Sequence, residues 1–173
     1  MKKILNKVSF LMGGTRFYSV SSILPTGSNK RTVDFWFYPL DLGKRYIFGN
    51  GSESNNCYWS SDIESGLSLV CWSNDHFSGV YPTTNAWNHA AYTFDGTYTK
   101  IYLNGKQILS TSAGSGMVSS QFCIGGRHGG ELFYGYISSL RISSNVRFTE
   151  NFNTNIVDTP EVKLIYTNFK IKE

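Results

Sequence analysis

Two tight-turn signals divide residues 87–112 into three short β-rich segments, and this pattern most constrains the fold. The three segments are Trp87–Phe94, Tyr98–Leu103 and Lys106–Thr111. Asp95-Gly96 and Asn104-Gly105 separate them, and these dipeptides supply the positive φ angles that hairpin turns need. The sequence therefore predicts a three-stranded antiparallel meander.

Similar β-rich runs fill the rest of the chain. The strongest is Thr32–Leu40, which is apolar on both faces except at Asp34, so we expect a strand covered on both sides. The other predicted strands are Arg16–Ser22, Arg45–Phe48, two within Cys57–Ser73, Gln121–Gly125, Phe133–Ile142 and Glu161–Phe169. Residues 145–154 have room for one short helical turn. The pattern predicts an all-β fold, a two-sheet antiparallel jelly-roll sandwich.

Composition is consistent with one folded domain. The chain has 173 residues, of which 40% are hydrophobic and 16% aromatic, so it can bury a core. The net charge is +4, and residues 1–50 carry eight Lys and Arg against two Asp. No tight basic cluster indicates nucleic-acid binding.

The cysteines and the N-terminal residues indicate in which cellular compartment the protein is made. Cys57, Cys71 and Cys123 cannot all pair and lack metal-ligand spacing, so we expect reduced thiols, with a Cys57–Cys71 bridge as the alternative. Asn6 and Lys7 interrupt the first apolar run, which argues against a signal peptide. No run approaches the roughly 20 apolar residues of a membrane span. We expect synthesis in the cytoplasm and no membrane span.

The meander also carries a family signature. Trp87–Ala91, Asp95-Gly96 and Ile101–Gly105 resemble the W-x-H-V-A, D-G and x-Y-V-N-G motifs of laminin G-like domains, which belong to the concanavalin A-like lectin/glucanase superfamily. Further matching runs are Thr32–Pro39, Cys123–Gly126 and Phe133–Ile142. The resemblance covers about residues 16–150. It implies a single concanavalin A-like sandwich over residues 16–173.

The resemblance also assigns individual positions. Trp36 and Trp87 match framework positions and are expected in the core, and His89 is expected to be an interior histidine. The sequence departs from the family pattern in His89-Ala90-Ala91, which stands in place of the valine form H-V-A, and at Ser139, where many members carry Asp or Glu.

The C-terminal part of the domain resembles that of a narrower group of laminin G-like domains. Arg141–Phe152 is similar to the R-I-x-x-x-V-A-R-Y-T-x-N-F ending of laminin G-like domains in tailed-bacteriophage structural proteins. This implies a virion protein: a capsid decoration, fibre or tail-associated subunit that docks to other virion proteins and adheres to host glycans. The protein would act in an oligomer or assembly, in the virion. Residues 1–15, which lie outside the motifs, are expected to form an anchoring arm.

Catalysis is not expected. The endoglucanases of the superfamily place three carboxylates at E-x-D-x-E or E-x-D-x-x-E spacing on one strand, so that alternate residues face the substrate. No Glu here begins such a motif, and Asp62-Ile63-Glu64 lacks the third carboxylate. A glycoside hydrolase is therefore the disfavoured alternative, and a soluble lectin with no assembly role is the other alternative.

Three loops contain residue types that bind sugars, because sugars stack on aromatic rings and hydrogen-bond to polar side chains. The candidate contacts to a glycan or a partner are Tyr58, Trp59, Trp72, Asn74, Asp75, His76, Arg127 and His128. For Trp59 and Trp72 the alternative is a place in the core. No cofactor is expected; the alternative is calcium bound through Asp62 and Asp75.

Overall fold

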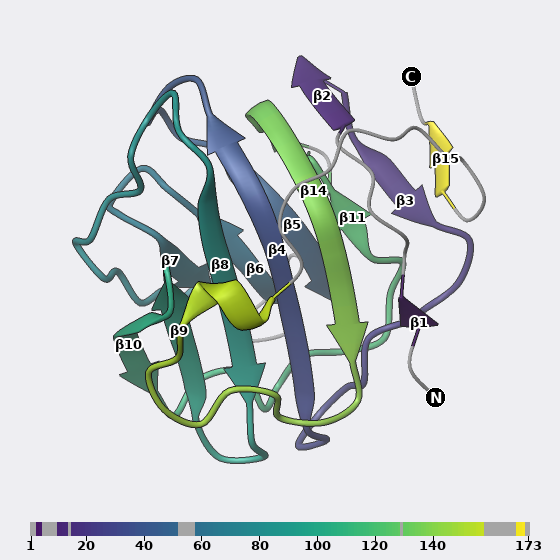
Figure 1. The fold of residues 1–173 in the computed structure, drawn as a ribbon. Helices are drawn as coiled ribbons and strands as arrows, with labels where there is room; N and C mark the ends of the chain where they lie inside the picture. The colour runs from purple at the N-terminus through teal and green to yellow at the C-terminus, as the bar shows by residue number, and fades with distance from the viewer. Residues whose placement is uncertain are drawn as a thin grey trace.

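Two antiparallel sheets pack face to face (Figure 1). The computed structural model describes residues 3–4, 10–13, 15–51, 58–128, 130–157 and 169–171. The two-sheet all-β fold confirms the predicted architecture. In the described part of the chain, no helix is long and apolar enough to cross a membrane.

The first sheet, here called sheet A, has the strand order β1-β14-β4-β8-β9-β10, and β2 also pairs with β14. Its strands are β1 (Lys3–Ile4), β2 (Phe10–Gly13), β4 (Arg31–Pro39), β8 (Asn88–Phe94), β9 (Thr99–Leu103), β10 (Lys106–Thr111) and β14 (Tyr134–Ser143). Two segments of the expected arm therefore lie along β14. Whether residues 1–15 anchor the protein stays a prediction.

The second sheet, sheet B, has the order β15-β3-β11-β5-β6-β7. Its strands are β3 (Phe17–Ser19), β5 (Tyr46–Gly51), β6 (Tyr58–Asp62), β7 (Ser68–Val70), β11 (Cys123–Ile124) and β15 (Phe169–Ile171). A separate hairpin joins β12 (Gly126–Arg127) to β13 (Gly130–Leu132). The sequence pattern missed this hairpin. Most of the predicted strand Glu161–Phe169 lies outside the described residues.

The meander forms as predicted, with β9 paired to both β8 and β10. Asn104 and Gly105 have φ angles of 50° and 79°, the left-handed values that this turn requires. A Cβ on Gly105 would lie 2.0 Å from the carbonyl oxygen of Phe152, so a side chain is excluded here for a second reason.

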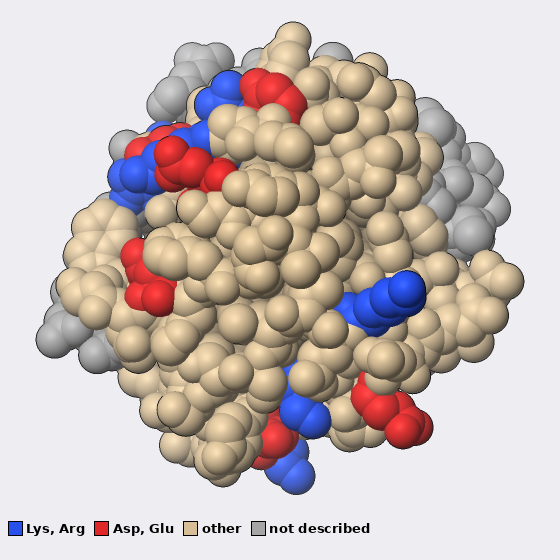
Figure 2. Space-filling view, turned by 90° about the vertical axis from the view of Figure 1, so that its left-hand side faces the viewer, with Lys and Arg blue, Asp and Glu red and all other residues tan. Residues whose placement is uncertain are grey.

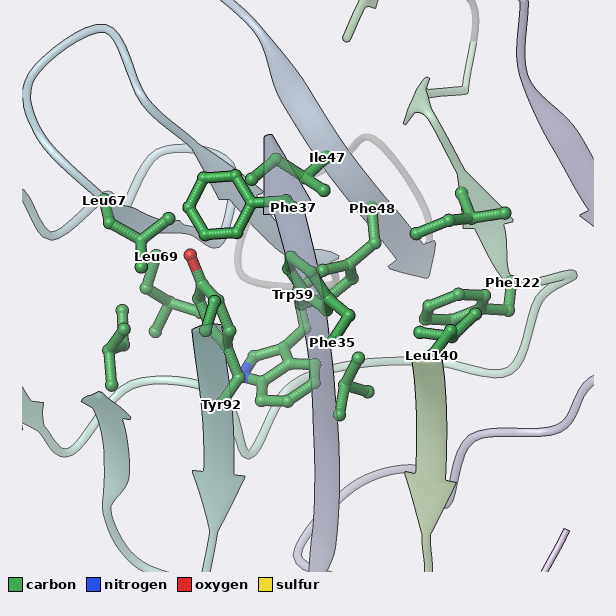
Figure 3. Close-up of a cluster of buried hydrophobic side chains, with 14 of the residues drawn as sticks. Phe35, Phe37, Ile47, Phe48, Trp59, Leu67, Leu69, Tyr92, Phe122 and Leu140 are labelled. Carbon is green, nitrogen blue, oxygen red and sulfur yellow. The ribbon is translucent and has the colours of Figure 1, made fainter. Parts of the chain in front are cut away.

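Strand β4 lies between β14 and β8 and contributes one face to the core. Val33, Phe35 and Phe37 are fully buried between the sheets. Phe35 contacts Phe48 of sheet B, with ring centres 6.0 Å apart. Figure 3 shows Phe48 surrounded by rings from both sheets, among them Trp59.

The other face of sheet A is partly covered by residues 145–157, here called the strap (Figure 1). Phe148 and Val157 of the strap form a second buried cluster with Ala91 and Tyr102, against which Trp36 packs. The short helix η1 (Thr154–Ile156) lies in the strap, close to the expected helical turn. The predicted cover on both sides of β4 is therefore confirmed for the part beneath the strap.

The strap is held by ionic and polar contacts as well. Arg147 pairs with the carboxylate of buried Asp34, which explains the acidic residue of β4. His89 is 1% exposed, and its Nε2 lies 3.6 Å from the same carboxylate. His89 is thus interior, as expected. Trp36 is half-buried and packs against the second buried cluster, so its expected core position is confirmed in part. Trp87 is half-buried and belongs to neither cluster, so its expected core position is wrong.

A buried guanidinium closes one end of the sandwich. Arg31, at the start of β4, lies 4.2 Å from the ring centre of Phe94 and 4.9 Å from that of Trp59. Its Nη1 donates to the carbonyls of Gly27 and Asn29 at 2.9 and 3.1 Å, and its Nη2 donates to that of Gly114. Burial lowers the pKa of Arg31 to about 10. Carbonyl dipoles and aromatic faces, rather than a carboxylate, compensate this charge among the described residues.

Replacing this guanidinium should be costly. Arg31→Met keeps much of the side-chain volume but leaves buried carbonyl groups without donors, so the free energy of unfolding should fall by roughly 3 kcal/mol. Urea denaturation measures this change. The matched control is Lys30→Met at the neighbouring exposed position, which should leave stability unchanged. Equal stability of the two variants would contradict the role given to Arg31.

Candidate functional site

Two of the three candidate loops meet on the sheet B side of the molecule. Arg127 on β12 lies over Trp72, which follows β7, with 5.1 Å between the guanidinium carbon and the ring centre. The same guanidinium lies 5.4 Å from the ring centre of Tyr46 on β5. These distances fit cation–π contacts. We call Tyr46, Trp72, Arg127 and Glu131 the Arg127 cluster.

The β12–β13 hairpin fixes Arg127. Its Nε pairs with the Glu131 carboxylate across the hairpin, and Lys44 lies 3.7 Å from the other oxygen of this carboxylate. The hydrogen bond from Arg127 lowers the pKa of Glu131, so this carboxylate stays ionised. Arg16 donates to the carbonyls of Arg127 and Gly130 at 2.9 and 3.0 Å. The cluster thus presents acceptors and donors beside an indole ring.

Trp72 is held in an unusual backbone conformation. Trp72 and Ser73 have φ angles of 59° and 69°, although neither residue is glycine. The Asp75 Oδ1 accepts the backbone N–H groups of Cys71 and Trp72, each at 3.0 Å, and so braces this turn. Left-handed non-glycine residues are strained and concentrate at ligand-binding sites. The strain therefore favours a functional role for the half-buried Trp72 ring.

His128 extends the site toward β3. Its ring stacks on Tyr18, with 5.2 Å between ring centres and an interplanar angle of 16°. Arg16 lies 5.9 Å from the Tyr18 ring centre. The structure therefore brings Trp72 and Arg127 of the predicted contacts together, and His128, the residue after Arg127, stacks on Tyr18 of β3.

Other predicted contacts take different positions. Asn74 is exposed next to the cluster, and Asp75 braces the loop. His76 pairs through its backbone with Leu69 at 2.8 and 3.0 Å, and its ring lies 3.2 Å from the Thr111 hydroxyl. His76 therefore covers the edge of β7. The Tyr58 side chain lies outside the described residues.

Trp59 is the clear correction. It is 0% exposed and lies between the sheets, where its ring contacts Phe48 at 5.5 Å and Tyr92 at 6.0 Å. The expected role as a glycan or partner contact is wrong, and the alternative of a core residue is confirmed. The next residues, Ser60 and Ser61, are both small and polar, so the sequence does not indicate which face of β6 points into the core.

The charges near this side of the molecule are mixed. Figure 2 shows positive and negative side chains interleaved at its upper left, beside a broad uncharged area. Among the described residues, Arg45 pairs with Asp41 and Arg127 pairs with Glu131. The described residues in this view form no continuous basic surface of the kind that binds nucleic acid.

The two candidate calcium ligands are engaged with the backbone. Asp62 Oδ1 accepts the N–H groups of Ile63 and Glu64 at 2.6 and 3.1 Å, and burial raises its pKa. Asp75 lies elsewhere, at the Trp72 turn. Among the described residues, no three His, Cys, Asp or Glu side chains converge as metal ligands usually do. The expectation of no cofactor, with calcium as its alternative, stays a prediction.

Comparison with known proteins identifies the family of this chain. Residues 13–151 match the laminin G family model described as the concanavalin A-like lectin/glucanases superfamily. The chain belongs to this superfamily. The family resemblance predicted from the meander and its flanking strands is therefore confirmed, whereas the resemblance to phage proteins is not tested by the match. No curated protein matches the sequence significantly.

Several solved structures share the superfamily fold. Domain 4 of the extracellular arabinanase AbnA from Geobacillus stearothermophilus, solved with arabinotriose, is 22% identical with a TM-score of 0.61, over 74% of this chain and 66% of that chain. The SAP-like pentraxin of Limulus polyphemus is 18% identical with a TM-score of 0.59, over 84% and 74%. The CBM40 of a Ruminococcus gnavus sialidase, bound to α2,3-sialyllactose, is 13% identical with a TM-score of 0.58, over 84% and 92%. At such identities the likeness establishes the fold.

Some members of the site had no signal in the sequence. Tyr46, Tyr18 and Lys44 lie in or beside strands whose alternation predicts only burial or exposure. They join the site because sheet B places β3 and β5 next to β11, from which the chain enters the β12–β13 hairpin. That pairing follows from tertiary structure and not from local pattern.

Two cysteines are buried as free thiols. Cys71 and Cys123 are 1% and 0% exposed, and burial raises the pKa of each to about 12. Reduced thiols are thus present at both positions. Cys57 lies outside the described residues, and the structure has no bridge at Cys71.

These thiols should be inert in the folded protein. With a pKa near 12, the thiolate fraction at pH 8 is on the order of 10⁻⁴, so iodoacetamide should modify neither Cys71 nor Cys123 at that pH. Peptide mass spectrometry measures modification at each position. The same reagent in urea is the control and should label both. Equal labelling with and without urea would contradict their burial.

Proposed function

We propose that this chain is a non-enzymatic carbohydrate-binding domain and that the Arg127 cluster contacts the glycan. The observation that carries this proposal is the half-buried Trp72 ring, held in a strained turn beneath Arg127. A ring fixed in this way can stack on the apolar face of a sugar without first losing side-chain freedom.

The polar groups around the ring suit sugar hydroxyls. A hydroxyl both donates and accepts, and the pair Arg127–Glu131 offers both roles at one place. Their side chains keep 17% and 28% of their surface exposed, and Asn74, two residues after Trp72, is exposed. Aromatic surface next to a few fixed polar groups is the usual composition of a ligand site.

Two of the similar structures support the same function. Domain 4 of the arabinanase was solved with arabinotriose, and the CBM40 was solved with sialyllactose. Neither sugar is assigned to this chain by that likeness. The proposal transfers only the class of ligand, a carbohydrate.

The position of the carboxylates supports a binding role rather than hydrolysis. Glycosidases need two carboxyl groups that flank a sugar bond. Here the Asp62 carboxylate is buried and accepts two backbone N–H groups, whereas Glu64 is exposed. One carboxylate of the nearest pair in the sequence, that of Asp62, is thus engaged in local structure.

Binding should depend on the indole of Trp72. On a glycan array, the full chain should bind at least one glycan class, and Trp72→Ala should weaken that binding at least tenfold because stacking is lost. The matched control is Phe77→Ala, which removes a 57% exposed ring from the same loop. Its binding should equal that of the unmodified chain. Binding by Trp72→Ala at full strength would refute this site.

A second candidate function is a structural role in a bacteriophage particle. The resemblance of Arg141–Phe152 to the ending of phage laminin G-like domains supports it. In the structure this ending forms the start of the strap, where Arg147 pairs with Asp34 and Phe148 is buried. A packing role therefore accounts for part of the motif. The remaining support is the resemblance itself, with virion proteins as the expected partners.

Mass spectrometry of density-purified particles tests this role. A virion subunit should be present in a fixed ratio to the major capsid protein, and an antibody to the chain should label one site by negative-stain microscopy. Unassembled protein from the same lysate is the control. Absence from the particles would remove the virion role and leave the glycan proposal unaffected.

A further inference from the structure

Four aromatic side chains form a row on the outer face of sheet A, separate from the Arg127 cluster. Tyr134 and Tyr136 belong to β14, Tyr38 belongs to β4, and Trp87 directly precedes β8. The ring centre of Tyr38 lies 5.8 Å from that of Tyr136 and 5.7 Å from that of Trp87. Tyr134 and Tyr136 are 48% and 38% exposed. We call these four residues the aromatic row.

The backbone beneath the row is fixed. Tyr136 lies directly opposite Tyr38 in the β14–β4 pairing, and a Cβ on Gly135 would lie 2.1 Å from the Tyr38 carbonyl oxygen. The buried Asn88 side chain holds the loop before β8 through the backbone of Thr83 at 2.8 and 3.1 Å. Trp87 is thereby positioned next to Tyr38. A ligand would meet rings already in place, which lowers the entropy cost of binding.

The row continues an apolar surface that the strap covers only in part. Trp36, two residues before Tyr38 on the same face of β4, packs against the strap cluster. Beyond it, the strap leaves Tyr134 and Tyr136 exposed. Single exposed aromatic residues are ordinary, but a contiguous row on a rigid sheet marks an interaction site.

The chemistry of the row favours a sugar without charge. Each of the four side chains has a polar atom, a phenol hydroxyl or an indole N–H, beside an apolar ring. In the described ranges, the cation–π contacts involve other rings: Tyr18, Tyr46, Trp59, Trp72, Phe94 and Phe148. A neutral pyranose or furanose matches this surface, because its C–H face stacks and its hydroxyls meet the polar atoms.

We propose that the aromatic row is a second ligand site, which binds a neutral glycan by stacking on Tyr136, Tyr38 and Trp87. This site does not depend on the Arg127 cluster, so the two can fail separately. Two sites on opposite sheets would let one domain bridge two glycan chains, or bind one polymer with greater avidity.

Affinity electrophoresis in native gels tests this proposal. The probes are neutral polysaccharides, namely glucomannan, galactomannan, arabinoxylan and mixed-linkage glucan, with anionic polygalacturonate for comparison. At least one neutral polymer should retard the full chain. Tyr136→Ala and Trp87→Ala should each weaken that retardation at least tenfold. Trp72→Ala should retain retardation by that polymer.

The control variant is Tyr98→Ala, which removes a 49% exposed ring from the β8–β9 turn, beyond the other end of β8. It should migrate like the unmodified chain, and thermal melting should show that all variants fold. No retardation by any neutral polymer, or unchanged retardation of Tyr136→Ala, would overturn the proposal. Loss of self-association in Tyr136→Ala by analytical ultracentrifugation, without any effect of glycan, would identify a second copy as the occupant and also overturn it.

Discussion

The ring of Phe48 is the contact on which the sandwich depends. It lies within 5.0–6.0 Å of Tyr92, Trp59, Phe122 and Phe35, measured between ring centres. These residues come from both sheets, so one side chain of β5 joins β4, β6, β8 and the segment before β11. Aromatic pairs in edge-to-face or stacked geometry add to the burial of apolar surface. The strands that meet around Phe48 also position the two surfaces described above, the Arg127 cluster and the aromatic row.

The second constraint is that sheet A must cover part of its outer face with its own chain. Asp34 and His89 point to this face, where a carboxylate and an imidazole would be costly beneath apolar groups without compensation. Arg147 supplies the opposite charge, and Phe148 and Phe152 surround the imidazole with ring centres 6.2 and 5.7 Å away. The strap therefore combines an ion pair with aromatic packing. The strap packs over Ala91 and Tyr102, whereas Tyr134 and Tyr136 on β14 stay exposed.

The parts of the fold that depend on local pattern were predictable. Alternation and turn dipeptides gave the meander, β4 and β14 nearly to their boundaries, and the family motifs gave the superfamily. The interaction of Asp34 with Arg147 spans 113 residues and has no local signal. The same limit applies to Arg127 and Trp72, which were both singled out but in separate loops. Trp59 failed as a surface contact because the periodicity of β6 does not say which face meets the core. The hairpin β12–β13 was missed because its strands are too short for a pattern.

The tight fit between Gly105 and the strap also sets an order of assembly. Phe152 donates its N–H to the Gly105 carbonyl at 2.9 Å, and its own carbonyl fills the space where a side chain would lie. The binding position for Phe152 at Gly105 forms only after the β9–β10 turn has closed. Neighbouring hairpins close early because their contacts are local, whereas the strap bridges a long interval of sequence. During synthesis, the strap can cover Trp36, Ala91 and Tyr102 only after the ribosome has released the chain as far as Phe152. A chain that ends before Phe148 would therefore lack the side chains that cover Trp36, Ala91 and Tyr102 in the folded protein.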